Sequence, residues 1–231
     1  MSATNMRIEP AQEHDLPRLA HIFTTAFSHI PWLRLVGYTP DSAGHALFTT
    51  NTLRAWALHS QKFSTPMTLK CVYKNPESGE EVIVGMANWI FHEREMAERE
   101  FAEWSYIFSA EWVADATQRA QARAFVRGML DRQVKWMGGR AFGELHFLCV
   151  DPVWERRGAG SALVRWGVQR CRELGVPGWA DATEVARRVY EREGFVCVEG
   201  VAVMVWWPEG WGEGERGMAL PGWEGRGGDG E

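Results

Sequence analysis

The residues that follow a predicted strand near position 150 have the types and spacing of an anion-binding turn. Gly158 and Gly160 stand where a helix is predicted to begin, and Arg156 and Arg157 precede them. A helix N-terminus presents unpaired N–H groups and a partial positive charge, which suit a phosphate or pyrophosphate. Glycines let the backbone approach such an anion without obstruction by side chains. The chain as a whole carries a net charge of −5, so the two arginines make this turn a locally positive site in an acidic protein.

The same strand, Gly-x-Gly turn and helix also describe a dinucleotide-binding fold. Asp181 lies about twenty residues further on, where such folds place an acidic residue against a ribose. Leu163 replaces the third glycine of that pattern, however, and too little chain follows to build the remaining parallel strands. A plain strand-to-helix turn that binds nothing is the other alternative.

Two further side chains could carry proton-transfer chemistry. Glu144 and His146 are two residues apart on a predicted strand, so its two-residue period places them on one face together with Leu148 and Val150. His146 titrates nearest to neutrality and is the better candidate for a base, although a polar pair that fixes a loop or faces solvent is the alternative.

Hydrophobic periodicity and turn signals predict the elements that would position these residues. A hairpin is predicted around the turn at 75–79, and a loop at 29–33 follows the first helix. The predicted helices are 16–27, 42–60, 114–138, 160–174 and 184–192. The predicted strands are 6–10, 67–73, 82–87, 144–150, 176–182 and a pair within 195–207.

Composition narrows the class of protein. With 45% hydrophobic and 24% charged residues, the 231-residue chain is typical of a globular protein. We expect one domain over 1–208 and a Gly/Glu/Trp-rich flexible tail over 209–231. The negative net charge argues against a nucleic-acid binder. No run reaches the roughly 18–20 apolar residues of a membrane span, and the N-terminus has no signal-peptide pattern, so we expect a cytoplasmic protein. The four cysteines lie far apart, which predicts neither a metal site nor a disulfide scaffold.

Two motifs resemble those of the GNAT acetyltransferase superfamily. Val150-x-Pro152-x-x-Glu155-x-x-Gly158-x-Gly160 is similar to the family's Val-x-Pro-x-x-(Gln/Arg)-x-x-Gly-x-(Gly/Ala) motif. Thr183-x-x-Ala186-x-x-x-Tyr190-x-x-x-Gly194-Phe195 resembles its Asn-x-x-Ala-x-x-x-Tyr-x-x-x-Gly-Phe element. Two residues depart from the family pattern: Glu155 replaces Gln or Arg, and Thr183 replaces Asn. We expect Glu155 to point away from the cofactor.

The resemblance implies an α/β (α+β) GNAT fold, with a mixed, mostly antiparallel twisted sheet flanked by helices. It also implies acetyl transfer from acetyl-CoA to a primary amine of a small molecule by direct attack, with Tyr190 as general acid and no metal. The Tyr190 phenol suits this role because it is neutral at pH 7 and can donate a proton, and a packed core tyrosine is the alternative. Glu144 and His146 occupy positions where arylalkylamine N-acetyltransferases of this superfamily carry two histidines. The pantetheine arm would enter between the strands ending at Val150 and Ala182. The residues implied in CoA binding are Leu148, Cys149, Val150, Arg156, Arg157, Gly158, Ala159, Gly160, Ser161 and Thr183.

The acceptor is less defined by the sequence. Residues 29–33 fall where these folds shape the acceptor pocket, and the aromatic residues of 101–112 could cover it, which favours a small hydrophobic or aromatic amine. Two alternatives stay open: a protein or peptide N-acetyltransferase, and a catalytically silent acyl-CoA-binding module. The expected partners are a CoA thioester and an amine, with the chain a monomer or homodimer. The sequence leaves open the amine, the acyl chain, the base, the oligomeric state and the role of the tail.

Overall fold

A seven-stranded sheet forms the centre of the computed structural model, which describes residues 5–62, 65–95, 110, 112–200, 202–212 and 216. Its strand order is β1-β2-β3-β4-β5-β7-β6, and every neighbouring pair is antiparallel except β4 and β5, which are parallel. The strands are β1 Met6–Pro10, β2 Thr65–Lys74, β3 Glu81–His92, β4 Phe142–Val150, β5 Gly178–Asp181, β6 Val196–Glu199 and β7 Val203–Trp206. The predicted α/β fold with a mixed, mostly antiparallel sheet flanked by helices is therefore confirmed.

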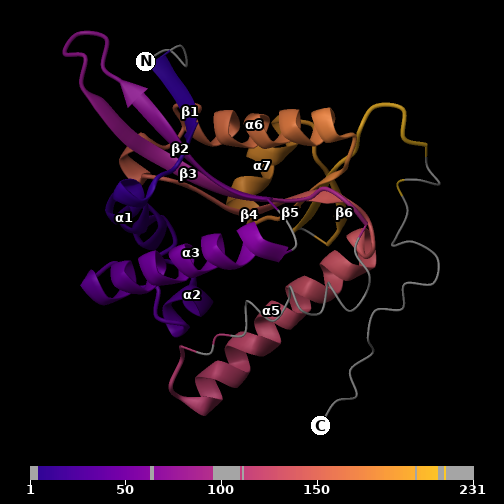
Figure 1. Cartoon of the computed structure of the whole chain (residues 1–231), viewed down its shortest axis with the longest axis horizontal. Coiled ribbons are helices and arrows are strands. Elements are labelled where there is room, and N and C mark those ends of the chain that lie inside the picture. The colour runs from indigo at the N-terminus through magenta and orange to yellow at the C-terminus, as the bar shows by residue number, and fades with distance from the viewer. Residues whose placement is uncertain are drawn as a thin grey trace.

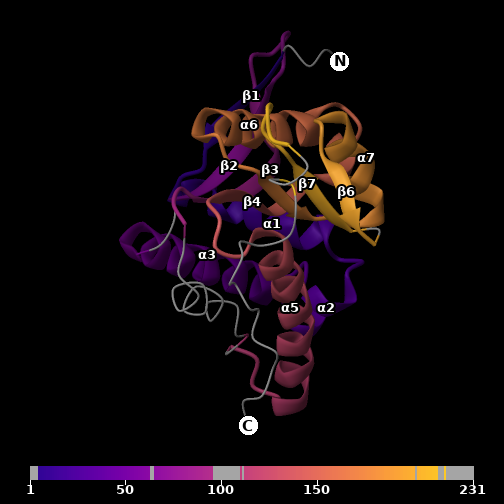
Figure 2. The ribbon, with the colours of Figure 1, turned by 90° about the vertical axis from the view of Figure 1, so that its right-hand side faces the viewer.

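Helices cover both faces of this sheet, as Figures 1 and 2 show. One face carries α6 and α7, and the other carries α1, α2, α3 and α5. The helices are α1 Leu16–Ala26, α2 Pro31–Leu35, α3 Ser42–Lys62, α5 Ala116–Met137, α6 Ala159–Leu174 and α7 Glu184–Arg192, with short 3-10 helices at Glu13–Asp15 and Pro152–Trp154. Within the described part of the chain, no helix combines the length and apolarity needed to cross a bilayer.

The predicted elements agree with these bounds apart from their ends, with one exception. Residues 29–33 were expected as a loop, but Pro31 begins the short helix α2. Proline suits the first helical turn because its missing N–H has no intrahelical partner there. Strand β3 also continues to His92, beyond the predicted end at residue 87, because Trp89, Ile90 and Phe91 are all buried between helices on the two faces.

Helix α6 lies unusually close to the sheet at Gly167. A Cβ added there would meet the Trp89 ring at 1.9 Å, so only glycine fits under this indole. The Trp89 Nε1 donates to the Leu163 carbonyl at 3.3 Å, and the ring stacks on Phe91. This packing fixes the height of α6 above β3 and β4, and with it the position of the helix N-terminus.

The opposite face is held by an aromatic cluster around Phe23 of α1. Its ring contacts those of Phe27, Tyr38, Phe48 and Phe147 at centroid distances between 4.8 and 5.3 Å. Because these residues come from α1, α3, β4 and the segment between α2 and α3, the cluster joins the N-terminal helices to the middle of the sheet.

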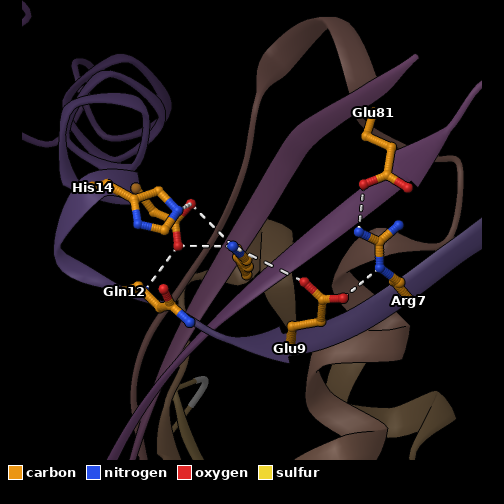
Figure 3. Close-up of polar contacts among 7 residues, drawn as sticks. Arg7, Glu9, Gln12, His14 and Glu81 are labelled. Carbon is orange, nitrogen blue, oxygen red and sulfur yellow. Dashed lines mark hydrogen bonds and ion pairs between the residues drawn. The ribbon is translucent and has the colours of Figure 1, made fainter.

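A chain of ion pairs anchors β1 and the start of α1 to the sheet (Figure 3). Arg7 bonds to both Glu9 and Glu81, linking β1 with β3. The Lys70 Nζ lies 2.8 Å from Asp15 Oδ2, and the side chains are only 12% and 5% exposed. Asp15 also accepts from the Gln12 N–H at 2.8 Å. Burial alone would raise the pKa of Asp15, but Lys70 and this N–H lower it below its usual value.

Replacing Asp15 with Asn should therefore destabilise the fold by about 3 kcal/mol near pH 7, because Lys70 loses its buried partner. A lowered folded-state pKa means that the stabilisation is present above the unfolded pKa and is lost as pH falls through the folded value. Urea unfolding from pH 7 to pH 3 should show the difference between wild type and Asp15→Asn shrinking below about pH 4. The control is Glu13→Gln, the same charge change at an exposed residue of the same turn. An equal loss in both variants would contradict the assignment.

Candidate functional site

Strands β4 and β5 pair at their beginnings and then diverge. Only residues 143–145 of β4 pair with β5, at Gly178, Trp179 and Ala180, although β4 continues to Val150. Beyond Leu145, no described strand pairs with the side of β4 that faces β5. This edge therefore offers backbone groups to an extended ligand, in the manner of an added strand.

A β-bulge in β4 lies where the divergence begins. Asn88 pairs with Phe147 and the next residue, Trp89, pairs with Leu145, so His146 is the extra residue. A bulge shifts the alternation of side chains along a strand. The prediction that Glu144, His146, Leu148 and Val150 share one face is therefore wrong. Leu148 and Val150 pack against the buried apolar residues between the sheet and α6. Glu144 and His146 instead contact each other on the face that carries α5.

Glu144 and His146 form a buried pair. The His146 Nδ1 lies 2.9 Å from Glu144 Oε1, and the side chains are 14% and 9% exposed respectively. Burial would raise the pKa of Glu144, but the hydrogen bond from His146 and the electrostatic interactions with the imidazoles of His146 and His92 lower it below the usual value. A carboxylate only accepts hydrogen bonds, so Nδ1 carries the hydrogen and Nε2 is the basic nitrogen of the neutral ring.

His146 and Phe147 both line each of three hollows in the structure. The α7-side cleft has a volume of about 170 Å³ and the α5-side pocket about 120 Å³. The α3-side pocket has a volume of about 100 Å³.

The cleft is lined by Phe27, Ile30, Trp32, Leu33, Phe125, Met129, Arg132, Leu145, His146, Phe147, Leu148, Asp181, Ala182, Thr183, Ala186 and Tyr190. The α5-side pocket is lined by Trp32, Val36, Tyr38, Ala110, Trp112, Ala122, Val126, Met129, Leu130, Gln133, Glu144, Leu145, His146, Phe147, Trp179 and Asp181. The α3-side pocket is lined by Phe23, Tyr38, Phe48, Asn51, Thr52, Arg54, Ala55, Trp56, Thr68, Met86, Asn88, Ile90, Trp112, His146 and Phe147.

Tyr190 projects from α7 into the same cleft as His146 and Leu148. Its side chain is almost fully buried, and burial together with the negative charge of Asp181 raises the pKa of Tyr190 well above 10. The phenol is therefore protonated at neutral pH and able to donate. Thr183, which also lines the cleft, caps α7 by accepting from the Ala186 N–H at 3.4 Å.

The glycine turn forms the N-terminus of α6. Gly158 is the N-cap with φ +96°, a left-handed conformation that favours glycine, and no side chain caps this end. The first helical hydrogen bond runs from Ala162 N to Gly158 O at 3.0 Å, so the amides of residues 159–161 precede it. These amides make a cradle that fits a phosphate group. A Cβ on Gly160 would lie 3.8 Å from Val150 and from Val189, so the cradle lies beside the end of β4 and α7.

The charged residues of this turn are all exposed, including Glu155 and Arg156. Arg157 lies 4.9 Å over the ring of Trp154, which gives its guanidinium a defined place near the turn. Among the residues predicted to bind the cofactor, Cys149 has its side chain on the other face of β4. Its thiol is buried there against the core cluster that contains Phe23 of α1. Burial raises the pKa of the Cys149 thiol, so only its backbone remains suited to a ligand.

Two ion pairs at the site could not be found from local spacing. Arg18 of α1 bonds to Asp151, which follows β4 and caps the 3-10 helix through the Val153 N–H. Arg132 of α5 lies 2.7 Å from Asp181 at the end of β5. The partners are 133 and 49 residues apart in sequence, and an isolated arginine carries no signal of so distant a carboxylate.

Some residues of the segments predicted to shape an acceptor pocket line the hollows. Ile30, Trp32 and Leu33 line the α7-side cleft. Of the aromatic segment 101–112, Trp112 lines two of the hollows and donates to the Val36 carbonyl at 2.9 Å. The aromatic residues between 101 and 109, and most of the predicted tail over 209–231, lie outside the described residues.

Comparison with known proteins agrees with this geometry. Residues 84–195 match the model of the Acetyltransferase (GNAT) family. A mycothiol acetyltransferase from Propionibacterium freudenreichii is 42% identical over 64 residues, which is 26% of this chain and 20% of that protein. The chain thus matches about a fifth of the length of this curated relative.

Solved acetyltransferases share the fold. A structure from Corynebacterium glutamicum described as histone acetyltransferase HPA2 and related acetyltransferase is 20% identical, with a TM-score of 0.52, over 94% of this chain and 99% of that one. Arylalkylamine N-acetyltransferase 2 from Aedes aegypti is 15% identical, with a TM-score of 0.57, over 87% and 98%. At these identities the likeness concerns the architecture, including the sheet that carries the site.

Replacing Gly158 with Ala should weaken binding of CoA about tenfold, because a φ of +96° costs an alanine roughly 1–2 kcal/mol and relaxation would displace the amide cradle. Gly175→Ala is the matched control, since Gly175 ends the same helix with φ +69° and open space around it. Calorimetric titration with CoA measures the effect. Both variants should lose stability, and equal loss of CoA affinity in both would contradict the role of the turn.

Proposed function

We propose that this chain, which belongs to the acetyltransferase (GNAT) family, transfers an acetyl group from acetyl-CoA to a primary amine of a small molecule. The similarity to a mycothiol acetyltransferase supports acetyl transfer as the reaction. The observation that carries the proposal is the opening between β4 and β5, because His146 and Tyr190 line one cleft along the unpaired edge of β4.

The cofactor site that we propose has two parts. The amides of residues 159–161 at the start of α6 would hold the pyrophosphate, with Arg156 and Arg157 adding positive charge. The backbone of Leu148, Cys149 and Val150 would pair with the amides of the pantetheine arm. Thr183, at the N-cap of α7, lines the cleft and would border the arm there. Acetyl-CoA supplies the acetyl group as a thioester.

His146 is proposed as the base. An amine is protonated at neutral pH and must lose a proton before it can attack a carbonyl carbon. Glu144 accepts from Nδ1 of His146, which orients the ring and stabilises the positive charge that it gains when Nε2 takes the proton. Glu144 is thus a positioning residue, and its lowered pKa keeps it ionised for this role.

Tyr190 is proposed as the acid. As the new C–N bond forms and the C–S bond breaks, the leaving sulfur needs a proton, and Tyr190 holds one at neutral pH because burial raises its pKa. A buried tyrosinate is reprotonated readily for the same reason, so the group is ready for another cycle.

The acidic residues favour a small acceptor over a basic peptide. Glu144 is paired with His146 and Asp181 with Arg132, so both carboxylates that line the hollows are already compensated. Aromatic side chains make up much of the remaining walls, among them Trp32, Phe147 and Trp179. Such walls suit an amine with an apolar body.

Tyr190→Phe should lower kcat about 10²-fold or more and leave CoA affinity within about twofold, since only the transferable proton is removed. Release of free thiol from acetyl-CoA over a panel of amines measures kcat, and calorimetry measures CoA binding. Phe195, which packs against Tyr190 with ring centroids 5.7 Å apart, offers a packing control as Phe195→Leu. Wild-type kcat in Tyr190→Phe would remove this residue from the mechanism.

The double variant Glu144→Gln, His146→Ala should lower kcat/KM by about 10²–10⁴-fold at pH 7 and recover part of it at higher pH, where more of the amine is deprotonated in solution. Glu144→Gln alone should retain more activity than the double variant, because the base itself remains. Initial rates from pH 6 to pH 10 test this. Wild-type rates in the double variant exclude the pair as base, and CoA binding with no turnover of any amine by the wild type supports a silent binding module instead.

A further inference from the structure

The α3-side pocket contains a set of uncharged hydrogen-bonding groups that the proposed mechanism does not use. At its wall, Thr68 Oγ1 accepts from Asn88 Nδ2 and from Trp56 Nε1, each at 2.9 Å. Thr68 is 5% exposed. A hydroxyl that accepts twice still has its hydrogen to donate, and no described residue accepts it.

A second hydroxyl on the pocket wall has the same arrangement. The Tyr38 hydroxyl oxygen accepts a hydrogen bond from Asn51 Nδ2 at 2.8 Å. The hydroxyl's own hydrogen is therefore still available for donation. Burial raises the pKa of Tyr38 to about 12, so this donor is neutral. Tyr38 lines both the α3-side and the α5-side pockets, as His146 does.

The two pockets differ in their charged side chains, although both carboxylates of the α5-side pocket are paired, Glu144 with His146 and Asp181 with Arg132. Among the described residues that line the α3-side pocket there is no carboxylate, and the cationic side chains are Arg54, which is exposed, and His146 when protonated. The α5-side pocket contains Glu144 and Asp181, and its described lining has no lysine or arginine. A ligand that reaches from His146 into the α3-side pocket therefore meets two hydroxyl donors and a guanidinium.

We propose that the α3-side pocket binds a carboxylate of the acceptor, so that the acceptor is a primary amine that carries a carboxylate group. Carboxylates accept hydrogen bonds only, and hydroxyl and guanidinium donors give them short, charge-assisted bonds. The apolar stem between the two ends would lie against Phe23, Met86 and Phe147 on the same wall. The inference rests on the proposed transfer to an amine and adds the substrate class.

The test compares amines that differ only in the carboxylate. Wild-type kcat/KM is measured by thiol release for phenethylamine against 4-(2-aminoethyl)benzoate, and for pentylamine and hexylamine against 6-aminohexanoate. We expect at least one carboxylate-bearing amine to exceed its plain counterpart about tenfold or more. Arg54→Gln and Tyr38→Phe should each reduce this ratio about tenfold. Arg34→Gln, the same charge change on exposed α2, should leave the ratio unchanged.

The possible failures are distinct. If plain amines are acetylated as well as or better than their carboxylate counterparts, or if Arg54→Gln and Tyr38→Phe leave the ratio unchanged, the inference is overturned while the proposed function stands. If no amine of the panel is acetylated, the proposed function fails and the inference fails with it. Because Arg54 is exposed, Arg54→Gln should fold normally, and its melting temperature checks this.

Discussion

The extra residue in β4 is the constraint on which the site depends. Without the bulge at His146, the alternation of β4 would continue unbroken, and either the apolar residues that face α6 or the Glu144–His146 pair would point to the wrong side of the sheet. The bulge resolves this conflict within one residue. It also stands where β4 leaves β5, so the same local irregularity places His146 on the face that carries α5, beside the unpaired edge of β4. Bulges next to active sites serve this purpose of redirecting a side chain.

Compensated carboxylates hold the helices in place around this strand. Four largely buried acids are each paired with a basic group. Three of these partners come from another part of the chain, and only the Glu144–His146 pair lies within a single element. The three long-range pairs join α1 to the end of β4, the start of α1 to β2, and α5 to the end of β5. An ion pair of this kind adds little net stability but costs much when one partner is lost. The pairs are Arg18–Asp151, Lys70–Asp15, Arg132–Asp181 and His146–Glu144.

Most of the elements and the glycine turn could be predicted from sequence, because periodicity, turn residues and a helix N-terminus are local signals. The Gly158 turn and the helix that it starts were placed within one residue. The bulge could not be predicted, since it depends on the register between β3 and β4. The two-residue period therefore wrongly assigned Leu148 and Val150 to the same face of the sheet as Glu144. The pairing of Arg132 with Asp181 could not be predicted from the sequence for a related reason. It forms only when α5 packs across the end of β5. The roles of the predicted site residues await the experiments above.

The bond between Arg18 and Asp151 has a practical consequence for protein engineering. The segment that matches the family model begins at residue 84, whereas Arg18, Tyr38, Asn51 and Arg54 precede it. The chain thus divides into an N-terminal portion that shapes one side of the site and a later portion that carries the glycine turn. A chimera that exchanges the N-terminal portion between relatives would alter the pocket while keeping the turn, but only if the donor sequence supplies an arginine at the position of Arg18. Recombination libraries built from this scaffold should therefore treat Arg18 and Asp151 as a linked pair of sites.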